Sequence, residues 1–373
     1  MASPNDLKHI IVLGAGVIGL TTGLNIQQER PYKVTIIADQ FPTDPKGIRY
    51  ASLSAGAHHV SIAESDPVQR AIDLETFETM WGLSEPDGEA QQCFLRLPQY
   101  EFYRNESNYD TLKLMPGFSE LPEDSLTPNS IAGITYNTVN TDAPVFLNYL
   151  LSKFLASGGS IVKATVNHID QVIEGGAVAF TDNDETTKML PSAIINCLGL
   201  GARVLGGVED HNVYPVRGQT VLIRAPWIQR CMSLSGGSDK IWTYVIPRRS
   251  GDVIIGGTYE ANDWYPRPRP ETTIDILTRV LEICPEVVPP KIRAQRAPTI
   301  DDVRPIIIEE SCGLRPCRKG GPRLEVEWIE AKSRRIPVVH NYGHGGFGYI
   351  ACYGSASGAC KLLEEALAMA PSL

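Results

Sequence analysis

Apolar residues near the start of the chain follow a strand pattern and then a helix pattern. Residues 10–13 form an unbroken apolar run, and after a glycine-rich stretch Leu20, Leu24 and Ile26 recur at roughly helical spacing. A second apolar run over 33–38 contains β-branched residues and fits a second strand. The pattern predicts strand, tight turn, helix and strand, which is the first part of a doubly wound parallel sheet.

The remaining pattern predicts two kinds of domain. Short alternating strands with proline and glycine turns begin at Tyr214, whereas helices and buried strands precede it. We expect an α/β protein with a doubly wound, Rossmann-like domain interlocked with a mixed, largely antiparallel sheet domain. The predicted helices cover 65–81, 145–156, 272–283 and 355–369, and the predicted strands cover 160–166, 193–197, 219–224, 242–246 and 252–258. We expect short strands and loops over residues 95–130, and whether this region forms an active-site lid is left open.

The glycine-rich stretch has the spacing of a dinucleotide-binding turn. Gly14 allows a sharp turn, Gly16 allows the backbone to approach a pyrophosphate, and Gly19 allows the helix to pack closely on the strand. Asp39 follows the second strand, twenty positions after Gly19, where a carboxylate can accept hydrogen bonds from a ribose. We predict a bound dinucleotide; the alternative is a turn that contains glycines in an ordinary core.

Length and charge restrict the class of protein. The 373 residues suggest two domains, and the net charge of −9 gives no positive surface for nucleic acid or an anionic membrane. No apolar run approaches the roughly 18–20 residues needed to cross a bilayer. Because the glycine turn lies so close to the first Met, we also expect no signal peptide and a soluble protein.

Cysteine and histidine positions indicate no metal site. The eight cysteines are scattered without Cys-x-x-Cys pairs, as expected for free thiols, although a Cys231–Cys284 bridge is left open. His58 and His59 are adjacent, so on an extended segment they face opposite ways, and packing is favoured over metal binding. The small residues before them suggest close approach to a neighbouring helix or to a cofactor ring.

Five motifs together resemble the D-amino acid oxidase family, which includes D-aspartate oxidase, and look closest to its yeast-type members. They occur in order along essentially the whole chain: Gly14–Gly19, Val216–Thr220, Gly256–Tyr259, Gly313–Pro316 and Asn341–Gly346. The resemblance implies a flavoprotein with non-covalent FAD. It also implies hydride transfer from Cα of a D-amino acid to the flavin, reoxidation by oxygen to hydrogen peroxide, and hydrolysis of the imino acid to a 2-oxo acid and ammonia.

The same resemblance implies site residues. Arg315 would bind the substrate carboxylate, Tyr244 and Tyr259 would lie in the active site, and the Gly346 carbonyl would accept from the substrate amine. An arginine fork suits a carboxylate because it binds both oxygens. The expected cofactor-binding residues are Gly14, Ala15, Gly16, Val17, Ile18, Gly19, Asp39, Ser54, Ala55, Gly56, Val166, Leu198, Gly199, Gly345, Gly346, Phe347, Gly348, Tyr349 and Ile350. The family usually has Thr at the position of Leu198, so backbone contacts would replace a hydroxyl there.

The substrate preference has two candidates. Mammalian D-aspartate oxidases carry an arginine where Tyr259 stands, which favours neutral D-amino acids. Acidic D-amino acids need a second cation, for which the candidates are Lys240, Arg248, His58 and His59. We assign 1–60, 140–204 and 300–373 to the FAD-binding domain, and 61–139 and 205–299 to the substrate-binding domain.

Other functions and the location remain as alternatives. A nicotinamide-dependent dehydrogenase uses the same glycine turn, and a catalytically silent flavin-binding module is a third alternative. The partners expected are a small D-amino acid and oxygen, with neither nucleic acid nor membrane, and a homo-oligomer is left open. The family often ends in a Ser-Lys-Leu peroxisomal signal, whereas this chain ends in Pro371–Leu373, so we expect a peroxisomal location or, failing the signal, a cytoplasmic one.

Overall fold

The computed structural model describes residues 7–28, 32–61, 63, 66–181, 189–236, 241–331 and 334–369. The chain forms two compact units. Unit 1 comprises Met1–Lys46, Leu147–Pro215 and Arg315–Leu373, and unit 2 comprises Gly47–Phe146 and Val216–Leu314. These bounds differ from the sequence-based division, which placed 47–60, 140–146 and 300–314 in the first domain and 205–215 in the second.

Unit 1 contains a six-stranded sheet with the order β14-β15-β7-β1-β2-β6. The strands are β1 Lys8–Leu13, β2 Tyr32–Ala38, β6 Ser160–Lys163, β7 Ala193–Asn196, β14 Arg323–Ala331 and β15 Arg334–Tyr342. Every neighbouring pair is parallel except β14–β15. This arrangement confirms the doubly wound sheet that the sequence predicted.

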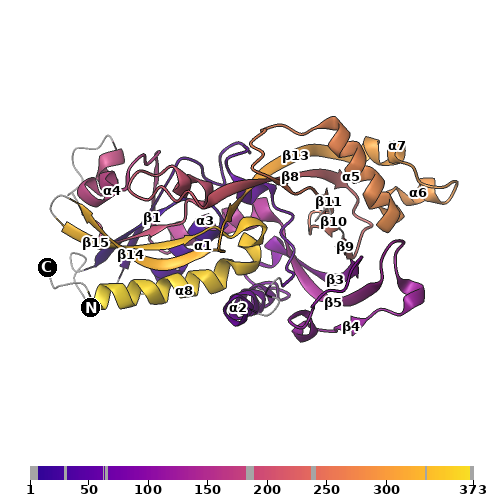
Figure 1. The fold of residues 1–373 in the computed structure, drawn as a ribbon, viewed down its shortest axis with the longest axis horizontal. Coiled ribbons are helices and arrows are strands. Elements are labelled where there is room, and N and C mark those ends of the chain that lie inside the picture. The colour runs from indigo at the N-terminus through magenta and orange to yellow at the C-terminus, as the bar shows by residue number, and fades with distance from the viewer. Residues whose placement is uncertain are drawn as a thin grey trace. The chain divides into compact units, whose positions relative to one another are not determined.

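The helices of unit 1 explain why its central strands are apolar throughout. They are α1 Val17–Gln28, α3 Ala143–Ala156, α4 Ile169–Gly175 and α8 Gly348–Met369. Helix α8 packs against α1 and along β14 and β15 (Figure 1). Strand β1 is buried from His9 to Leu13, as expected for a parallel strand covered on both faces.

Unit 2 contains a mixed sheet of nine strands in which β12-β8-β11-β10-β9-β3-β5-β4 are neighbours and β13 pairs with β8. The strands are β3 Phe94–Tyr103, β4 Ser119–Glu120, β5 Ala132–Thr141, β8 Val213–Arg224, β9 Cys231–Ser235, β10 Thr243–Pro247, β11 Asp252–Gly256, β12 Glu260–Ala261 and β13 Ile307–Arg318. Most pairs are antiparallel, while β3–β9 is parallel. The predicted mixed, largely antiparallel sheet is confirmed.

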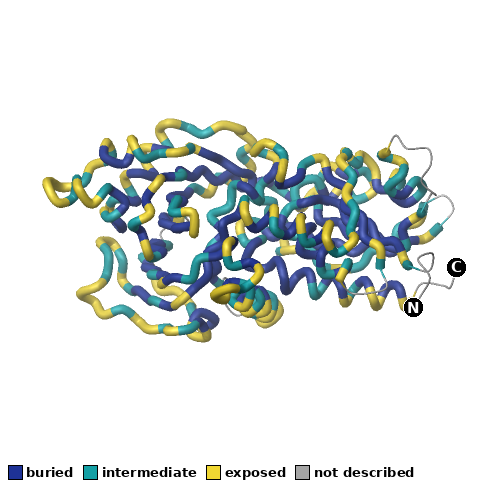
Figure 2. Tube along the Cα trace, turned by 180° about the vertical axis from the view of Figure 1, so that it is seen from behind, coloured by how far each residue is buried: buried dark blue, intermediate teal, exposed yellow. Residues whose placement is uncertain are grey.

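The core of unit 2 lies between this sheet and α5. The helices of the unit are α2 Pro67–Leu83, α5 Pro270–Ile283, α6 Pro290–Arg293 and α7 Ile300–Val303. Helix α5 packs on β9, β10 and β11, and its Ile276, Leu277 and Val280 are fully buried. Buried stretches of chain, including strands of both sheets, are dark blue in Figure 2.

Several predicted element bounds are wrong; strand β8, for example, begins at Val213 and not at residue 219. Helix α8 begins at Gly348, seven residues before the predicted start at 355, because packing outweighs the low helix propensity of its glycines. Strand β6 ends at Lys163 and not at Val166, since its partner β2 ends at Ala38, opposite Lys163. In 95–130 a ten-residue strand, β3, tolerates Pro98 because the pairing with β9 begins only at residue 99.

Other predictions concern thiols, membranes and the chain ends. Cys231 and Cys284 are both free and buried, so they do not form a bridge. Among the helices in the described part of the chain, none is long and apolar enough to cross a bilayer. Lys240 and the C-terminal Pro371–Leu373 lie outside the described residues, and the peroxisomal signal stays a prediction.

Candidate active site

The turn between β1 and α1 can be formed only with glycine. Gly14 has a φ of 98°, and its N–H donates to the Ile37 carbonyl at 2.9 Å. A Cβ on Gly14 would lie 2.7 Å from the Cys197 carbonyl oxygen, and a Cβ on Gly19 would lie 2.0 Å from the Gly14 carbonyl oxygen. Helix α1 therefore starts directly on the turn, and its first N–H groups form a site suited to phosphate.

The predicted cofactor residues follow the carboxyl ends of parallel strands. Asp39 is exposed immediately after β2, Leu198 and Gly199 follow β7, and Val166 follows β6. Gly199 has a φ of 56°. Because these strands are parallel, their carboxyl ends meet at one edge of the sheet, which is where doubly wound proteins bind ligands.

The glycine-rich segment 343–350 lies at the same edge, after β15. Gly343 and Gly345 have φ values of 92° and 58°, which permit the turn from the strand into α8. Gly348 starts α8, and a Cβ on it would lie 3.5 Å from a Val17 methyl group at the start of α1. Two helix starts are therefore adjacent here. Tyr349 and Ile350, which precede the predicted start of the last helix at 355, are buried in the first turn of α8.

Arg315 and Gly346, both predicted for substrate binding, are close together in unit 1. Arg315 lies on β13, at the residue where this strand passes from unit 2 into unit 1, and is partly exposed. A Cβ on Gly346 would lie 3.2 Å from Cδ and 3.4 Å from Nε of Arg315. The arginine side chain thus passes over the backbone of the glycine segment, and any larger residue at 346 would displace it.

The two predicted tyrosines belong to unit 2. Tyr244 lies on β10 with 9% of its surface exposed, and its ring centroid is 6.4 Å from that of His58. A Cβ on Gly257 would lie 2.4 Å from the Tyr244 hydroxyl oxygen, so the glycine pair in this motif makes room for the tyrosine. Tyr259 lies between β11 and β12 and is 47% exposed.

Ser54, Ala55 and Gly56 also belong to unit 2, at the end of a short 3₁₀ turn. A Cβ on Gly56 would lie 2.6 Å from the Ile246 Cδ1 atom, and a Cβ on Gly313 would lie 2.7 Å from the Ser54 Cβ atom. Close packing against the Ile246 side chain therefore accounts for Gly56, and the narrow space beside Ser54 accounts for Gly313. Their contact with a cofactor stays a prediction.

The candidate cations for an acidic substrate differ in charge. Burial lowers the pKa of His58 to about 4 and that of His59 to about 3, so both are neutral at pH 7. Arg248 is 7% exposed; its Nη2 donates to the Ala55 carbonyl at 3.0 Å, and its Nη1 lies 3.9 Å from the Asp142 carboxylate. Its Nε is buried with no hydrogen-bond partner among the described residues. Of these three candidates, only Arg248 carries a charge at neutral pH.

We expect His59 to make the free energy of unfolding depend on pH. Its folded-state pKa of about 3 lies below the ordinary 6.5, so its contribution is complete above pH 6.5 and is lost as the pH falls toward 3. Between pH 7 and pH 5 the wild type should lose on the order of 2 kcal/mol more of its free energy of unfolding than His59→Leu does. Chemical unfolding at the two pH values measures it, with exposed His211→Leu as the control. An equal loss in His59→Leu and wild type would contradict the assignment.

The described residues contain no group of three or more His, Cys, Asp or Glu side chains that could hold a metal ion.

Residues 9–362 match the family described as FAD dependent oxidoreductase. The chain belongs to this family. FAD is therefore the cofactor, and the glycine turn, the exposed Asp39 and the adjacent starts of α1 and α8 fit a dinucleotide with a pyrophosphate.

Two curated relatives match this FAD-dependent oxidoreductase over nearly their whole length. A D-aspartate oxidase of Cryptococcus neoformans var. grubii is 37% identical, with 98% of this chain and 99% of the relative covered. A D-amino-acid oxidase of Schizosaccharomyces pombe is 34% identical, with 95% and 96% covered. The predicted resemblance to the D-amino acid oxidase family is confirmed.

A solved structure shows the same fold. The L-proline dehydrogenase from P. horikoshii superposes with a TM-score of 0.70 over 96% of this chain and 94% of its own, at 13% identity. At that identity the likeness concerns the fold alone.

Proposed function

We propose that this FAD-dependent oxidoreductase oxidises D-amino acids to 2-oxo acids and releases ammonia and hydrogen peroxide. The observation that carries the proposal is the Arg315 side chain lying over Gly346, at the carboxyl edge of the sheet where the glycine turn lies. An arginine fork beside a backbone carbonyl provides one group for an α-carboxylate and one for an α-amine. The names of the two curated relatives support the same substrate class.

In this proposal the chain positions the substrate. Arg315 donates two parallel hydrogen bonds to the carboxylate, and the Gly346 carbonyl accepts from the amine, which fixes two of the substituents on Cα. Tyr259 adds a third hydrogen bond, and the rings of Tyr244 and Tyr259 exclude water. Bound FAD supplies the acceptor for the hydride that leaves Cα. Orientation of the Cα–H bond is therefore the main task of the protein.

The preferred D-amino acid has either a neutral or an acidic side chain, and a separate observation favours each. Neutral side chains are favoured because the half-buried His58 and the buried His59 are uncharged at pH 7 and Tyr259 brings no positive charge. D-aspartate is favoured by the charged Arg248, whose Nε has no partner among the described residues, and by the name of the 37% identical relative.

A panel of D-amino acids scored by peroxide release tests the proposal. We expect peroxide with D-amino acids and none with the matching L-amino acids, because with the carboxylate and the amine held only one hand of Cα would direct its hydrogen toward the hydride acceptor. Arg248→Leu should abolish activity on D-aspartate and spare D-alanine if Arg248 binds the acidic side chain. Failure of every D-amino acid to yield peroxide would refute the oxidase proposal.

Asp39→Ala should weaken FAD binding without changing the rate of flavin reduction at saturating FAD. Asp39 lies where the ribose is expected, and losing hydrogen bonds to a charged acceptor costs on the order of 1.5–3 kcal/mol, or roughly ten- to a hundredfold in Kd. Titration of the apoprotein with FAD, followed by fluorescence, measures it. Asp170→Ala, an exposed carboxylate at the start of α4, is the control. Equal FAD affinity in Asp39→Ala and wild type would mean that Asp39 does not contact the ribose.

A further inference from the structure

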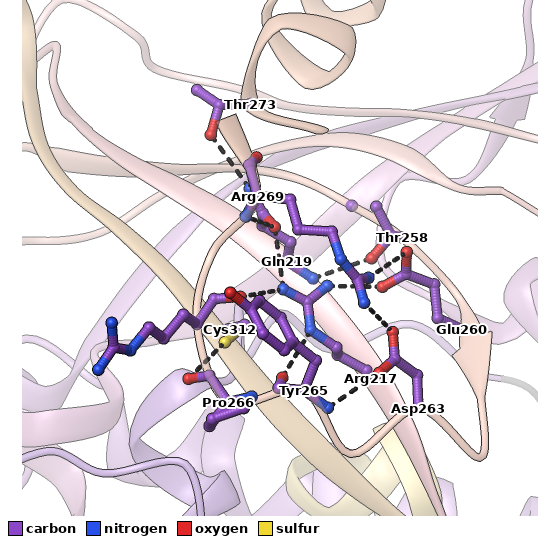
Figure 3. Close-up of polar contacts among 12 residues, drawn as sticks. Arg217, Gln219, Thr258, Glu260, Asp263, Tyr265, Pro266, Arg269, Thr273 and Cys312 are labelled. Atoms are coloured by element: carbon purple, nitrogen blue, oxygen red, sulfur yellow. Dashed lines mark hydrogen bonds and ion pairs between the residues drawn. The ribbon is translucent and has the colours of Figure 1, made fainter. Parts of the chain in front are cut away.

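Arg217 is a fully buried arginine on β8 of unit 2. Figure 3 shows its guanidinium among the polar groups of a neighbouring loop. The guanidinium donates to the Glu260 carboxylate at 2.6 Å, the Tyr265 carbonyl at 2.9 Å, the Arg267 carbonyl at 2.6 Å and the Gln219 side-chain oxygen at 3.1 Å. Three of these four acceptors lie in residues 258–269, the segment that connects β11 to α5.

Gln219 binds both ends of this segment. Its backbone N–H donates to the Thr258 hydroxyl at 2.9 Å, and its side chain both accepts from the Arg269 N–H and donates to the Arg269 carbonyl, each at 2.8 Å. Arg217 and Gln219 are two positions apart on one strand, so their side chains face the same side of the sheet. Together they bind segment 258–269 at its ends and in its middle.

Tyr259 lies between two residues that are bound to β8 in this way. Thr258 accepts from the Gln219 N–H, and Glu260 is paired with Arg217 both by its carboxylate and as a neighbour in the sheet. Strand β12 has only two residues, so it supplies few backbone hydrogen bonds. Tyr259 itself is 47% exposed, so the backbone on either side of it is held by β8 while about half of its surface faces solvent.

We infer that Arg217 is a positioning residue for the oxidase reaction and acts through Tyr259, which rests on the proposed contact of Tyr259 with the substrate. The planar fork of Arg217 fixes three points of segment 258–269 at once, which the point charge of a lysine cannot do. Buried ion pairs can often be replaced by apolar groups without loss of stability. We therefore assign to the Arg217–Glu260 pair the role of holding the segment in one geometry, and not that of stabilising the fold.

The experiment uses the holoenzyme and a double-mutant cycle. The variants are Arg217→Lys, Tyr259→Phe and the two combined. Arg224→Lys is the matched control because Arg224 lies on the same strand and pairs with Asp252 at 2.8 Å. For each variant we would measure the limiting rate of anaerobic flavin reduction by D-alanine, the Kd of D-alanine, the flavin content and the thermal unfolding temperature.

Arg217→Lys should lower the ratio of rate to Kd by up to about a hundredfold, as small misplacements of a positioning group do. It should keep a full flavin content, and Arg224→Lys should behave as wild type. If the two residues are coupled, the combined variant should lose less than the product of the two single losses in the ratio of rate to Kd. We expect its loss to be about fivefold smaller than that product, which corresponds to one neutral hydrogen bond. Two results would overturn the inference. One is a loss in the combined variant that equals the product of the single losses to within about twofold, and the other is an Arg217→Lys variant that reduces flavin as the wild type does.

The outcomes separate this inference from the proposed function. If Tyr259→Phe reduces flavin as wild type does, the proposed role of Tyr259 fails and the inference fails with it. If Tyr259→Phe is impaired but uncoupled from Arg217, only the inference fails. Glu260→Gln replaces Arg217→Lys if the latter does not fold. Glu260 is 32% exposed, and the amide keeps one acceptor while removing the charge. It should show the same coupling to Tyr259→Phe.

Discussion

Arg315→Ala should reduce D-alanine turnover by a large factor while the protein stays yellow. Removing one partner of a hydrogen-bonded charge pair costs on the order of 2–5 kcal/mol, which is roughly 30- to 4,000-fold in kcat/KM. Arg315→Lys keeps the charge but loses the planar fork, so flavin reduction should slow as well as binding weaken. Stopped-flow reduction without oxygen measures both quantities.

The control for Arg315 is another arginine of unit 1. Arg335 is exposed on β15 and lies over the Trp328 ring at 5.1 Å. Arg335→Ala should reduce flavin at the wild-type rate. If Arg315→Ala also reduces at that rate with unchanged affinity for D-alanine and D-aspartate, the substrate site at Arg315 and Gly346 is wrong.

Gly19→Ala should prevent FAD binding. A Cβ at this position lies 2.0 Å from the Gly14 carbonyl oxygen, so α1 must move away from the turn whose N–H groups face the phosphates. Overpacking of this kind costs typically 1–3 kcal/mol or more, and here the displacement falls directly on the cofactor site. The ratio of flavin to protein absorbance measures the result.

Gly82→Ala is the matched control for Gly19→Ala, because Gly82 also lies in a helix and a Cβ there has no atom within 4 Å. The control should bind FAD fully and should be more stable by about 0.5–1 kcal/mol, the usual helix preference of alanine over glycine. Stoichiometric flavin in Gly19→Ala would show that the turn does not have the tight packing described above.

The dinucleotide turn could be predicted from sequence because most of its determinants are local. The φ of Gly14 and the contact of Gly19 with Gly14 belong to one strand–turn–helix unit, and Asp39 lies at the end of the next strand; the contact of Gly14 with Cys197 comes from a distant segment. The apolar runs likewise predicted β1, β2 and β7, since a parallel strand covered on both faces contains few polar residues.

Features that depend on distant segments were missed or misplaced. The first turns of α8 contain glycine and lie before the predicted start of the helix, yet burial of Tyr349 and Ile350 stabilises them as helix. The pairing of β3 with β9 joins segments far apart in the chain, and no local pattern indicates it. Arg217 lies in a recognised motif, but three of its four partners lie 43 to 50 positions away, so no local pattern indicates that it is buried.

The most direct test of the central claim is the absorbance of the purified protein before and after an amino acid is added without oxygen. We predict a yellow protein with bound FAD whose visible absorbance is bleached by a D-amino acid, with D-alanine and D-aspartate tested separately, and is unchanged by L-alanine. Admission of oxygen should restore the colour and release one peroxide for each flavin reoxidised. A colourless protein, or a yellow one that no D-amino acid bleaches, would contradict the account.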